Sequence, residues 1–319
     1  MAQAGQPGEC ISESIFAWYG LGMRPETLPG YTLLPATLEL FRDWEQTAIE
    51  VSENAFKPLP SKFWLYAKNL VRGLTAEAYE DWNLPALHGT NNPRWMRDRR
   101  GHIVVVKDGT FRGFPLAARE RIASVLADSA AVPVLPSQIW QRRRPDGVVV
   151  YDSVSPKIFP DARVGPPDTM LLADDSLACA AIFNQWIFNT EQHKGNILFS
   201  ALGPEEGVKV YCDYGVSNHG ASNAVLPLNA SRMTEDKDVV YAFSASVAAH
   251  VREQIMASPR VQAVMRNIQN IPDRDIDAPF EVLPDYLFRA PDTKQHMSQR
   301  LKRRRDTIET LVNRSVGLG

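Results

Sequence analysis

The residues of this chain whose types and spacing could do chemistry lie in a polar loop and at the end of the strand after it. The loop carries Glu191, His193 and Asn196, and the strand ends at Asp213. An acid and an asparagine five residues apart, with a second acid near by, match the needs of phosphoryl transfer. The first acid orients or deprotonates the attacking hydroxyl, while the amide and the second acid hold magnesium on the nucleotide phosphates. We therefore predict Glu191 as the catalytic acid and Asn196 and Asp213 as the magnesium ligands.

A valine-rich segment upstream offers a cation for the same phosphates. Residues 103–107 read Ile-Val-Val-Val-Lys and precede Asp-Gly, which predicts a strand that ends at Lys107. In kinases a lysine at the end of such a strand grips the α- and β-phosphates and pairs with a glutamate on the next helix. Glu120 lies in the early turns of a helix predicted over 115–130. Lys107 and Glu120 are thus further candidate catalytic residues, although a solvated lysine and an ordinary surface acid fit the same pattern.

Further elements are needed to bring these groups together. Two β-branched runs around a charged turn predict a hairpin over 137–151, which completes a small antiparallel sheet with the Lys107 strand. The segment beyond the hairpin, about 152–157, is the predicted hinge that receives the adenine. A largely apolar helix over 176–188, opened by two aspartates, then delivers the polar loop.

The chain after residue 215 is predicted to be mainly helical. Helical patterns occur at 236–256, 258–269 and 293–312, and the Asp- and Pro-rich residues 272–291 form a long connection. The basic run 302–305 is interpreted as a solvated helix face, and nucleic acid is not expected as a partner.

The domain organisation follows from these patterns. Three helical patterns, the last at 75–82, predict a mainly helical N-terminal extension over 1–88. The fold class is α+β and two-lobed, with a small antiparallel sheet lobe over 89–157 and a larger helical lobe over 158–319.

Bulk composition narrows the classes of function. The 319 residues carry a net charge of −2, which favours neither nucleic acid nor an anionic membrane as a partner. Three cysteines without metal-type spacing fit free thiols in a reducing compartment. No apolar run reaches the roughly 20 residues that span a bilayer, and the first residues lack the features of a signal peptide. These features predict a cytoplasmic protein without membrane association.

Residues 189–215 resemble the HipA-like kinases and, more distantly, the phosphoinositide 3/4-kinase-like group. Those families carry Asp-x-His-x-x-Asn in the catalytic loop, often followed by Ile-Leu, and later a metal-binding aspartate. This chain reads Glu-Gln-His-Lys-Gly-Asn-Ile-Leu over 191–198, and Asp213 stands at the later position. The resemblance covers about 89–312. Its weaker parts lie at Lys107, at Arg119–Glu120, and at residues 132–136 and 303–306.

The resemblance implies a kinase-like fold and ATP- and magnesium-dependent phosphoryl transfer to a serine or threonine of a protein substrate. In the family the position of Glu191 is an aspartate, and the histidine equivalent to His193 is largely structural, hydrogen-bonding near the metal-binding carboxylate. The extra methylene of Glu191 moves its carboxylate by about 1.5 Å, and misplacement near 1 Å can cost about a hundredfold in rate. The chain is therefore either a divergent kinase or a nucleotide-binding pseudokinase that binds a regulatory partner. A lipid or small-molecule kinase is a third alternative.

Overall fold

A computed structural model describes the parts of the chain that carry most of the predicted elements. These parts are residues 79–81, 93–98, 103–108, 110–111, 114–143, 146–157, 163–189, 194–199, 209–215, 245–288 and 293–315. Glu191 and His193 lie outside them, as does nearly all of the predicted N-terminal extension.

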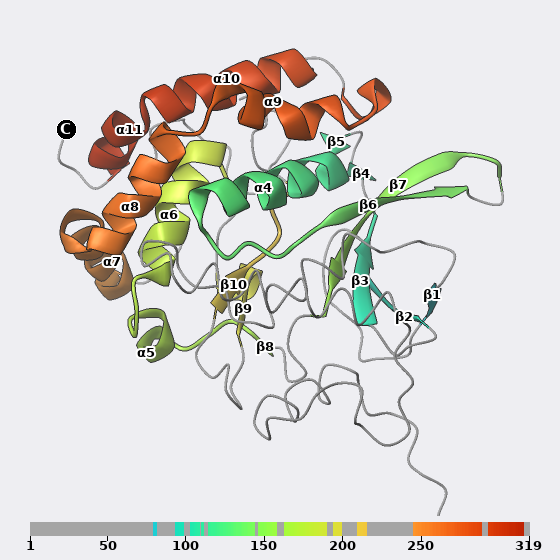
Figure 1. The fold of residues 1–319 in the computed structure, drawn as a ribbon. Helices are drawn as coiled ribbons and strands as arrows, with labels where there is room; N and C mark the ends of the chain where they lie inside the picture. Colours follow the sequence, from blue (N-terminus) through green and yellow to red (C-terminus); the bar gives the residue numbers. More distant parts are fainter. Residues whose placement is uncertain are drawn as a thin grey trace, which may run out of the picture.

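The described strands near the N-terminal side form an antiparallel sheet in the order β1-β2-β3-β7-β6 (Figure 1). The strands are β1 (Tyr79–Asp81), β2 (Arg94–Asp98), β3 (Ile103–Lys107), β6 (Gln138–Arg143) and β7 (Val149–Pro156). Alternate residues of β3 are buried, as expected for a strand with one covered face. Val104 and Val106 form a small hydrophobic cluster with Trp140 and Val154. The sheet therefore has a core of its own.

Two predictions about this sheet were wrong. A helix was predicted over 75–82, whereas Tyr79–Asp81 is a strand paired with β2. The predicted hinge at 152–157 falls mostly within β7, which runs on to Pro156. Its residues up to Val154 pair with the neighbouring strand β6, and those from Ser153 to Pro156 pair with β3. Pairing with β3, which is distant in sequence, therefore extends the strand. The predicted boundary at residue 88 stays a prediction, although β1 joins the sheet ahead of it.

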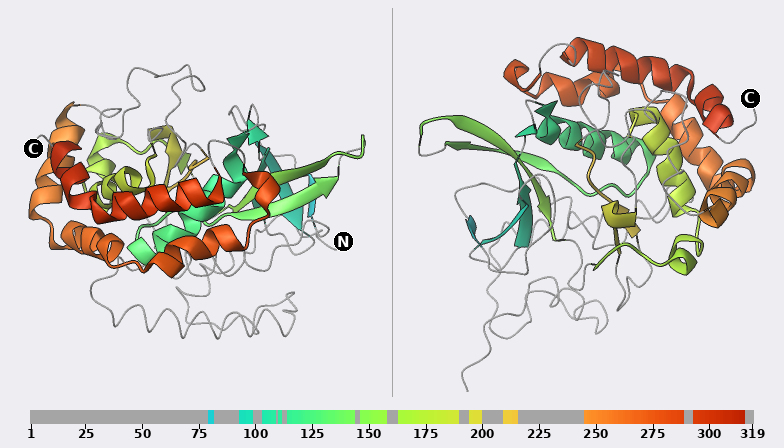
Figure 2. Two further views of the ribbon diagram at one scale, coloured as in Figure 1. Left: turned by 90° about the horizontal axis from the view of Figure 1, so that it is seen from above. Right: turned by 180° about the vertical axis from the view of Figure 1, so that it is seen from behind.

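The helix α4 (Leu116–Ala130) follows β3 after two short strands, β4 (Thr110–Phe111) and β5 (Phe114–Pro115). It lies between the sheet and the helical part of the molecule (Figures 1 and 2). Its apolar residues, among them Ala118, Ile122 and Leu126, belong to the large hydrophobic core of the helical part and not to the cluster of the sheet. The helix that carries Glu120 is thus anchored in the helical core.

The remaining described helices form the larger part of the fold. They are α5 (Asp168–Leu171), α6 (Ser176–Ile187), α7 (Ala245–Ala257), α8 (Pro259–Gln269), α9 (Asp273–Glu281), α10 (Lys294–Asp306) and α11 (Ile308–Ser315). Every residue of α6 is buried, and α7, α8, α10 and α11 all contact it. The predicted α+β class, a small antiparallel sheet with a larger helical part, is confirmed. Each described helix falls short of the length and apolar character that crossing a bilayer requires.

The C-terminal helices differ from the prediction in two places. The predicted connection over 272–291 contains α9, which begins after Pro272 and buries Ile276 and Phe280 one turn apart. The single helix predicted over 293–312 is instead two helices, with a break at Thr307. Its hydroxyl hydrogen-bonds the carbonyl of Arg303 at 2.9 Å, a contact that often bends a helix.

The basic run at 302–305 was predicted to be a solvated helix face, and this is wrong for one of its residues: Arg303 is exposed, but Arg304 is buried. Arg304 is only 4% exposed, and its guanidinium donates to the carbonyls of Gln185 and Trp186 at the end of α6. It also lies over the ring of Phe188, with 4.9 Å between guanidinium carbon and ring centroid. The arginine therefore caps the helix that leads into the polar loop.

A second, smaller sheet has the order β10-β9-β8 and contacts the start of α6, where the Tyr211 hydroxyl donates to Ser176 Oγ at 3.3 Å. Its strands are β8 (Arg163–Val164), β9 (Ile197–Phe199) and β10 (Lys209–Tyr211). The buried Lys209 ammonium donates to the Asp174 carboxylate at 2.8 Å and to the carbonyl of Met170 at 3.0 Å. These bonds fix β10 against the segment before α6.

Asp174 is expected to make stability depend on pH. Burial alone would raise the pKa of its carboxyl, but hydrogen bonds from Lys209 and Ser176 lower that pKa below its usual value. A lowered folded pKa stabilises the fold fully above the unfolded value of about 3.9, and this contribution is lost as pH falls through the folded pKa. We expect Asp174→Asn to lower the free energy of unfolding by about 1 kcal/mol or less at pH 7, because the Asp174 side chain is partly exposed. Urea unfolding measures this change.

The difference in the free energy of unfolding between the wild type and Asp174→Asn should be smaller when urea unfolding is measured at pH 3. Glu253→Gln, at an exposed position of α7, is the control that should show no such narrowing. A difference that stays constant from pH 7 to pH 3 would contradict the assignment of the ion pair.

Candidate active site

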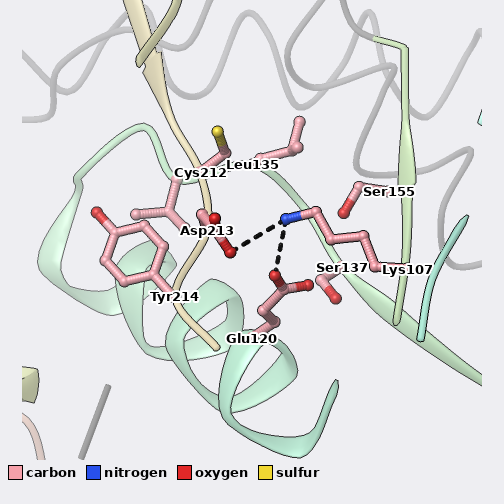
Figure 3. A pocket seen from close by; sticks show the side chains of 9 residues that line it. Lys107, Glu120, Leu135, Ser137, Ser155, Cys212, Asp213 and Tyr214 are labelled. Carbon is pink, nitrogen blue, oxygen red and sulfur yellow. Dashed lines mark hydrogen bonds and ion pairs between the residues drawn. The ribbon is translucent and has the colours of Figure 1, made fainter. Parts of the chain in front are cut away.

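Three of the predicted site residues meet in the structure. The Lys107 Nζ lies 3.0 Å from Glu120 Oε1 and 3.3 Å from Asp213 Oδ1 (Figure 3). The side chains of Lys107 and Glu120 are largely buried, while that of Asp213 is 36% exposed. One ammonium thus bridges a buried carboxylate and a carboxylate that still reaches solvent.

Each of these residues comes from a different element. Lys107 is the last residue of β3, Glu120 lies in the second turn of α4, and Asp213 follows the end of β10. The backbone of Asp213 is left-handed, with φ of 65°, a conformation that aspartate and asparagine tolerate better than most residues. Backbone strain of this kind clusters at functional sites, so it supports a role for Asp213 that favours this geometry.

The electrostatics keep Lys107 charged. Burial alone would lower the pKa of its ammonium, but the nearby carboxylates of Glu120 and Asp213 more than offset this and raise that pKa above its usual value. The amine is therefore a fixed positive charge at neutral pH. A fixed charge in a partly buried recess suits the binding of phosphate oxygens.

Asn196 lies next to this group through the backbone. Its carbonyl accepts a hydrogen bond from the Cys212 amide at 2.9 Å, and Cys212 immediately precedes Asp213. Asn196 is 5% exposed and ends the short 3-10 helix Lys194–Asn196. The chain thus brings the predicted magnesium ligands to adjacent backbone positions, although they are separated by 17 residues in sequence.

A small recess opens beside the Lys107 ammonium. Its lining includes the segment after α4, which is held to β10 because Leu135 N donates to Tyr211 O at 2.7 Å and Tyr211 N donates to Pro133 O at 2.9 Å. Burial raises the pKa of the Cys212 thiol to about 12, although Lys107 opposes that shift, so this cysteine is protonated at neutral pH. The full lining is Lys107, Glu120, Val134, Leu135, Ser137, Ser155, Cys212, Asp213 and Tyr214 (Figure 3).

Sequence reasoning missed the partner of the second Glu120 oxygen. Ser153 Oγ donates a hydrogen bond to Glu120 Oε2, and Ser137 Oγ lies 3.1 Å from Ser153 Oγ. Both serines are almost fully buried. The available signal was weak: Ser153 and Ser155 are small polar residues on alternate positions of a strand, which only indicates that they share a face.

The oxygen atoms of the described residues fit magnesium better than a metal that takes all of its ligands from the protein. Magnesium is commonly held by one or two protein carboxylates together with phosphate oxygens. Within the described ranges, no group of three or more His, Cys, Asp or Glu side chains is placed to hold a metal ion. Asp213 and Asn196 could therefore supply only part of a coordination shell, which a nucleotide would complete.

Comparison with known proteins finds similarity in three-dimensional structure alone. No family model matches the chain, and no curated protein matches it. The Helicobacter pylori proinflammatory kinase CtkA is similar over 75% of this chain and 97% of that one, with 11% identity and a TM-score of 0.45. The Leishmania major MAP kinase LmaMPK10 is similar over 75% of this chain and 83% of that one, with 12% identity and a TM-score of 0.27. The Drosophila melanogaster PAN3 pseudokinase is similar over 73% of this chain and 68% of that one, with 12% identity and a TM-score of 0.32. These TM-scores are below 0.5, so the interpretation of the site rests on its own geometry.

Proposed function

We propose that the protein binds ATP with magnesium and transfers its γ-phosphoryl group to a serine or threonine of a protein substrate, as a kinase of the HipA-like type. The observation that carries this proposal is the Lys107 ammonium held between Glu120 and Asp213 at 3.0 and 3.3 Å. A buried lysine–glutamate pair facing a solvent-accessible carboxylate is the arrangement that phosphoryl transfer needs around the nucleotide phosphates.

Each residue has a proposed role at the nucleotide. Lys107 binds phosphate oxygens, and Glu120 holds Lys107 in place. Asp213 and Asn196 would hold magnesium, which would supply positive charge to neutralise the phosphates. Glu191 is the proposed acid that orients the attacking hydroxyl, and His193 supports the nucleotide site from the same loop. Both of these residues lie outside the described ranges, so their roles rest on the sequence.

A second candidate is a nucleotide-binding pseudokinase that acts as a partner-binding module. The glutamate at 191 favours it, because the resembling family has the shorter aspartate there. The two candidates share nucleotide binding and differ in transfer. Transfer to a lipid or a small molecule, instead of a protein, would use the same nucleotide site and the same metal ligands.

The deciding experiment is a transfer assay with γ-labelled ATP and magnesium on the wild type and on Glu191→Asp. We expect measurable autophosphorylation or transfer by the wild type, and an increase of up to about a hundredfold in Glu191→Asp, because a shift of the carboxylate by about 1 Å can change the rate by that factor. Glu253→Asp, at an exposed position of α7, is the control for the loss of one methylene.

The outcomes separate the candidates. Transfer that appears only in Glu191→Asp identifies the wild type as a pseudokinase. A wild type that shows neither transfer nor magnesium-dependent nucleotide binding in a titration would remove both candidates.

A further inference from the structure

Ser153 occupies a specific place relative to the ion pair. Lys107 of β3 and Ser153 of β7 are directly opposite each other in the antiparallel register. Directly opposed residues of neighbouring strands leave the same face of a sheet. On that face both side chains reach the same carboxylate of α4: Lys107 Nζ bonds to Oε1 of Glu120 and Ser153 Oγ to Oε2.

The donor count fixes the direction of the hydrogen bonds. A serine hydroxyl has one hydrogen, and a carboxylate only accepts. Because Ser153 donates its hydrogen to Glu120, it can only accept from Ser137, whose Oγ lies 3.1 Å away. The chain of donation therefore runs from Ser137 to Ser153 to Glu120.

This chain is buried and tied to the backbone. Ser137 is 1% exposed, Ser153 is 2% exposed and Glu120 is 6% exposed, so water does not compete freely for these bonds. Arg121, the residue after Glu120, donates from Nη1 to the carbonyl of Ser137 at 2.7 Å. Both ends of the chain are thus fixed between α4 and the sheet.

We propose that Ser153, supported by Ser137, is a positioning residue that fixes the Glu120 carboxylate and through it the Lys107 ammonium at the nucleotide phosphates. The inference rests on the proposed nucleotide site and adds a residue to it. Without the Ser153 hydroxyl, Glu120 Oε2 has no described donor, and the carboxylate is free to rotate away from Lys107. Lys107 then keeps its contact with Asp213 at 3.3 Å but loses the second carboxylate that fixes it where phosphate oxygens bind.

The first test compares ligands with and without phosphates. Ser153→Ala should weaken binding of magnesium–ADP by roughly tenfold, since a hydrogen bond to a charged group contributes about that factor, and leave adenosine binding within about twofold. Ser153→Thr retains the hydroxyl and should bind both ligands like the wild type. Ser124→Ala is the matched control, because Ser124 is a buried serine of α4 whose hydroxyl donates to the Arg121 carbonyl of its own helix.

The second test works without any nucleotide. A Lys107 side chain that Glu120 no longer holds is less shielded in the recess, so Lys107 in Ser153→Ala should react with acetic anhydride at pH 9 about threefold faster or more. Mass spectrometry of the Lys107 peptide measures this rate, and Ser124→Ala should match the wild type. If Ser153→Ala does not fold, Ser137→Ala should shift both readouts in the same direction by a smaller factor.

Each outcome decides a separate point. An unchanged Lys107 labelling rate in Ser153→Ala overturns the positioning role, as does a uniform loss of ADP and adenosine affinity. Faster labelling in a protein whose wild type binds no nucleotide supports the positioning role and refutes the proposed function.

Discussion

Asp213→Asn is expected to lower the rate of phosphoryl transfer by roughly 100- to 1,000-fold while the protein stays folded. Loss of a preorganised group that stabilises charge at a reacting centre has an effect of that size. Asparagine is the informative replacement, because it retains the shape of the side chain and tolerates the left-handed backbone at φ 65°. It removes the charge that faces Lys107 at 3.3 Å and the proposed bond to magnesium. The measurement is transfer from γ-labelled ATP at several magnesium concentrations, with circular dichroism to verify folding.

A matched substitution shows whether the effect belongs to this position. Asp146→Asn removes a carboxylate from the exposed turn between β6 and β7, where it accepts a hydrogen bond from the Val148 amide. Transfer by this variant should equal that of the wild type. If Asp213→Asn retains transfer within about threefold, Asp213 does not hold the metal and the proposed mechanism is wrong.

Arg304→Ala is expected to reduce the free energy of unfolding by about 3 kcal/mol. The substitution removes the hydrogen bonds from the guanidinium to the carbonyls of Gln185 and Trp186 near the end of α6, and the contact with the ring of Phe188. The carbonyls stay buried without the guanidinium, and a buried acceptor that loses its donor is costly. Urea unfolding followed by circular dichroism measures the change.

The neighbouring residue supplies the control. Arg303→Ala removes the same side chain from an exposed position of α10, where the expected change is within about 0.5 kcal/mol. Arg304→Lys should fall between the two, because lysine keeps the charge but cannot reproduce the planar fork of donors. Equal effects at 303 and 304 would show that burial of Arg304 does not stabilise the fold.

The sequence predicted those elements whose signal is local. The β-branched run predicted β3, and the apolar spacing predicted α4. Lys107 and Glu120 could therefore be assigned to these two elements from the sequence. Elements that depend on distant partners were missed. The extension of β7 to Pro156 is caused by pairing with the distant strand β3. The acidic and proline-rich composition around α9 hid two apolar residues that other helices cover.

The same distinction holds for individual side chains in and around the site. Lys107 and Asp213 have residue types and contexts that phosphoryl transfer requires, so they could be named before their contact was known. Arg304 cannot be told from Arg303 by type, since only packing against α6 makes one buried and the other exposed. Ser153 carries no sequence signature, because its importance lies in the register that sets it opposite Lys107.

The anchoring of α4 determines what happens when the molecule is heated. The helix α4, which carries Glu120, packs its apolar residues into the core of the helices, whereas Lys107 belongs to a sheet with a separate, smaller cluster of apolar side chains. Detachment of the sheet therefore breaks both ion pairs of Lys107 in a single event. A ligand that binds Lys107 and Asp213 at once stabilises the contact between the sheet and the helices. Its presence should therefore merge the melting of the sheet and of the helices into one cooperative calorimetric transition.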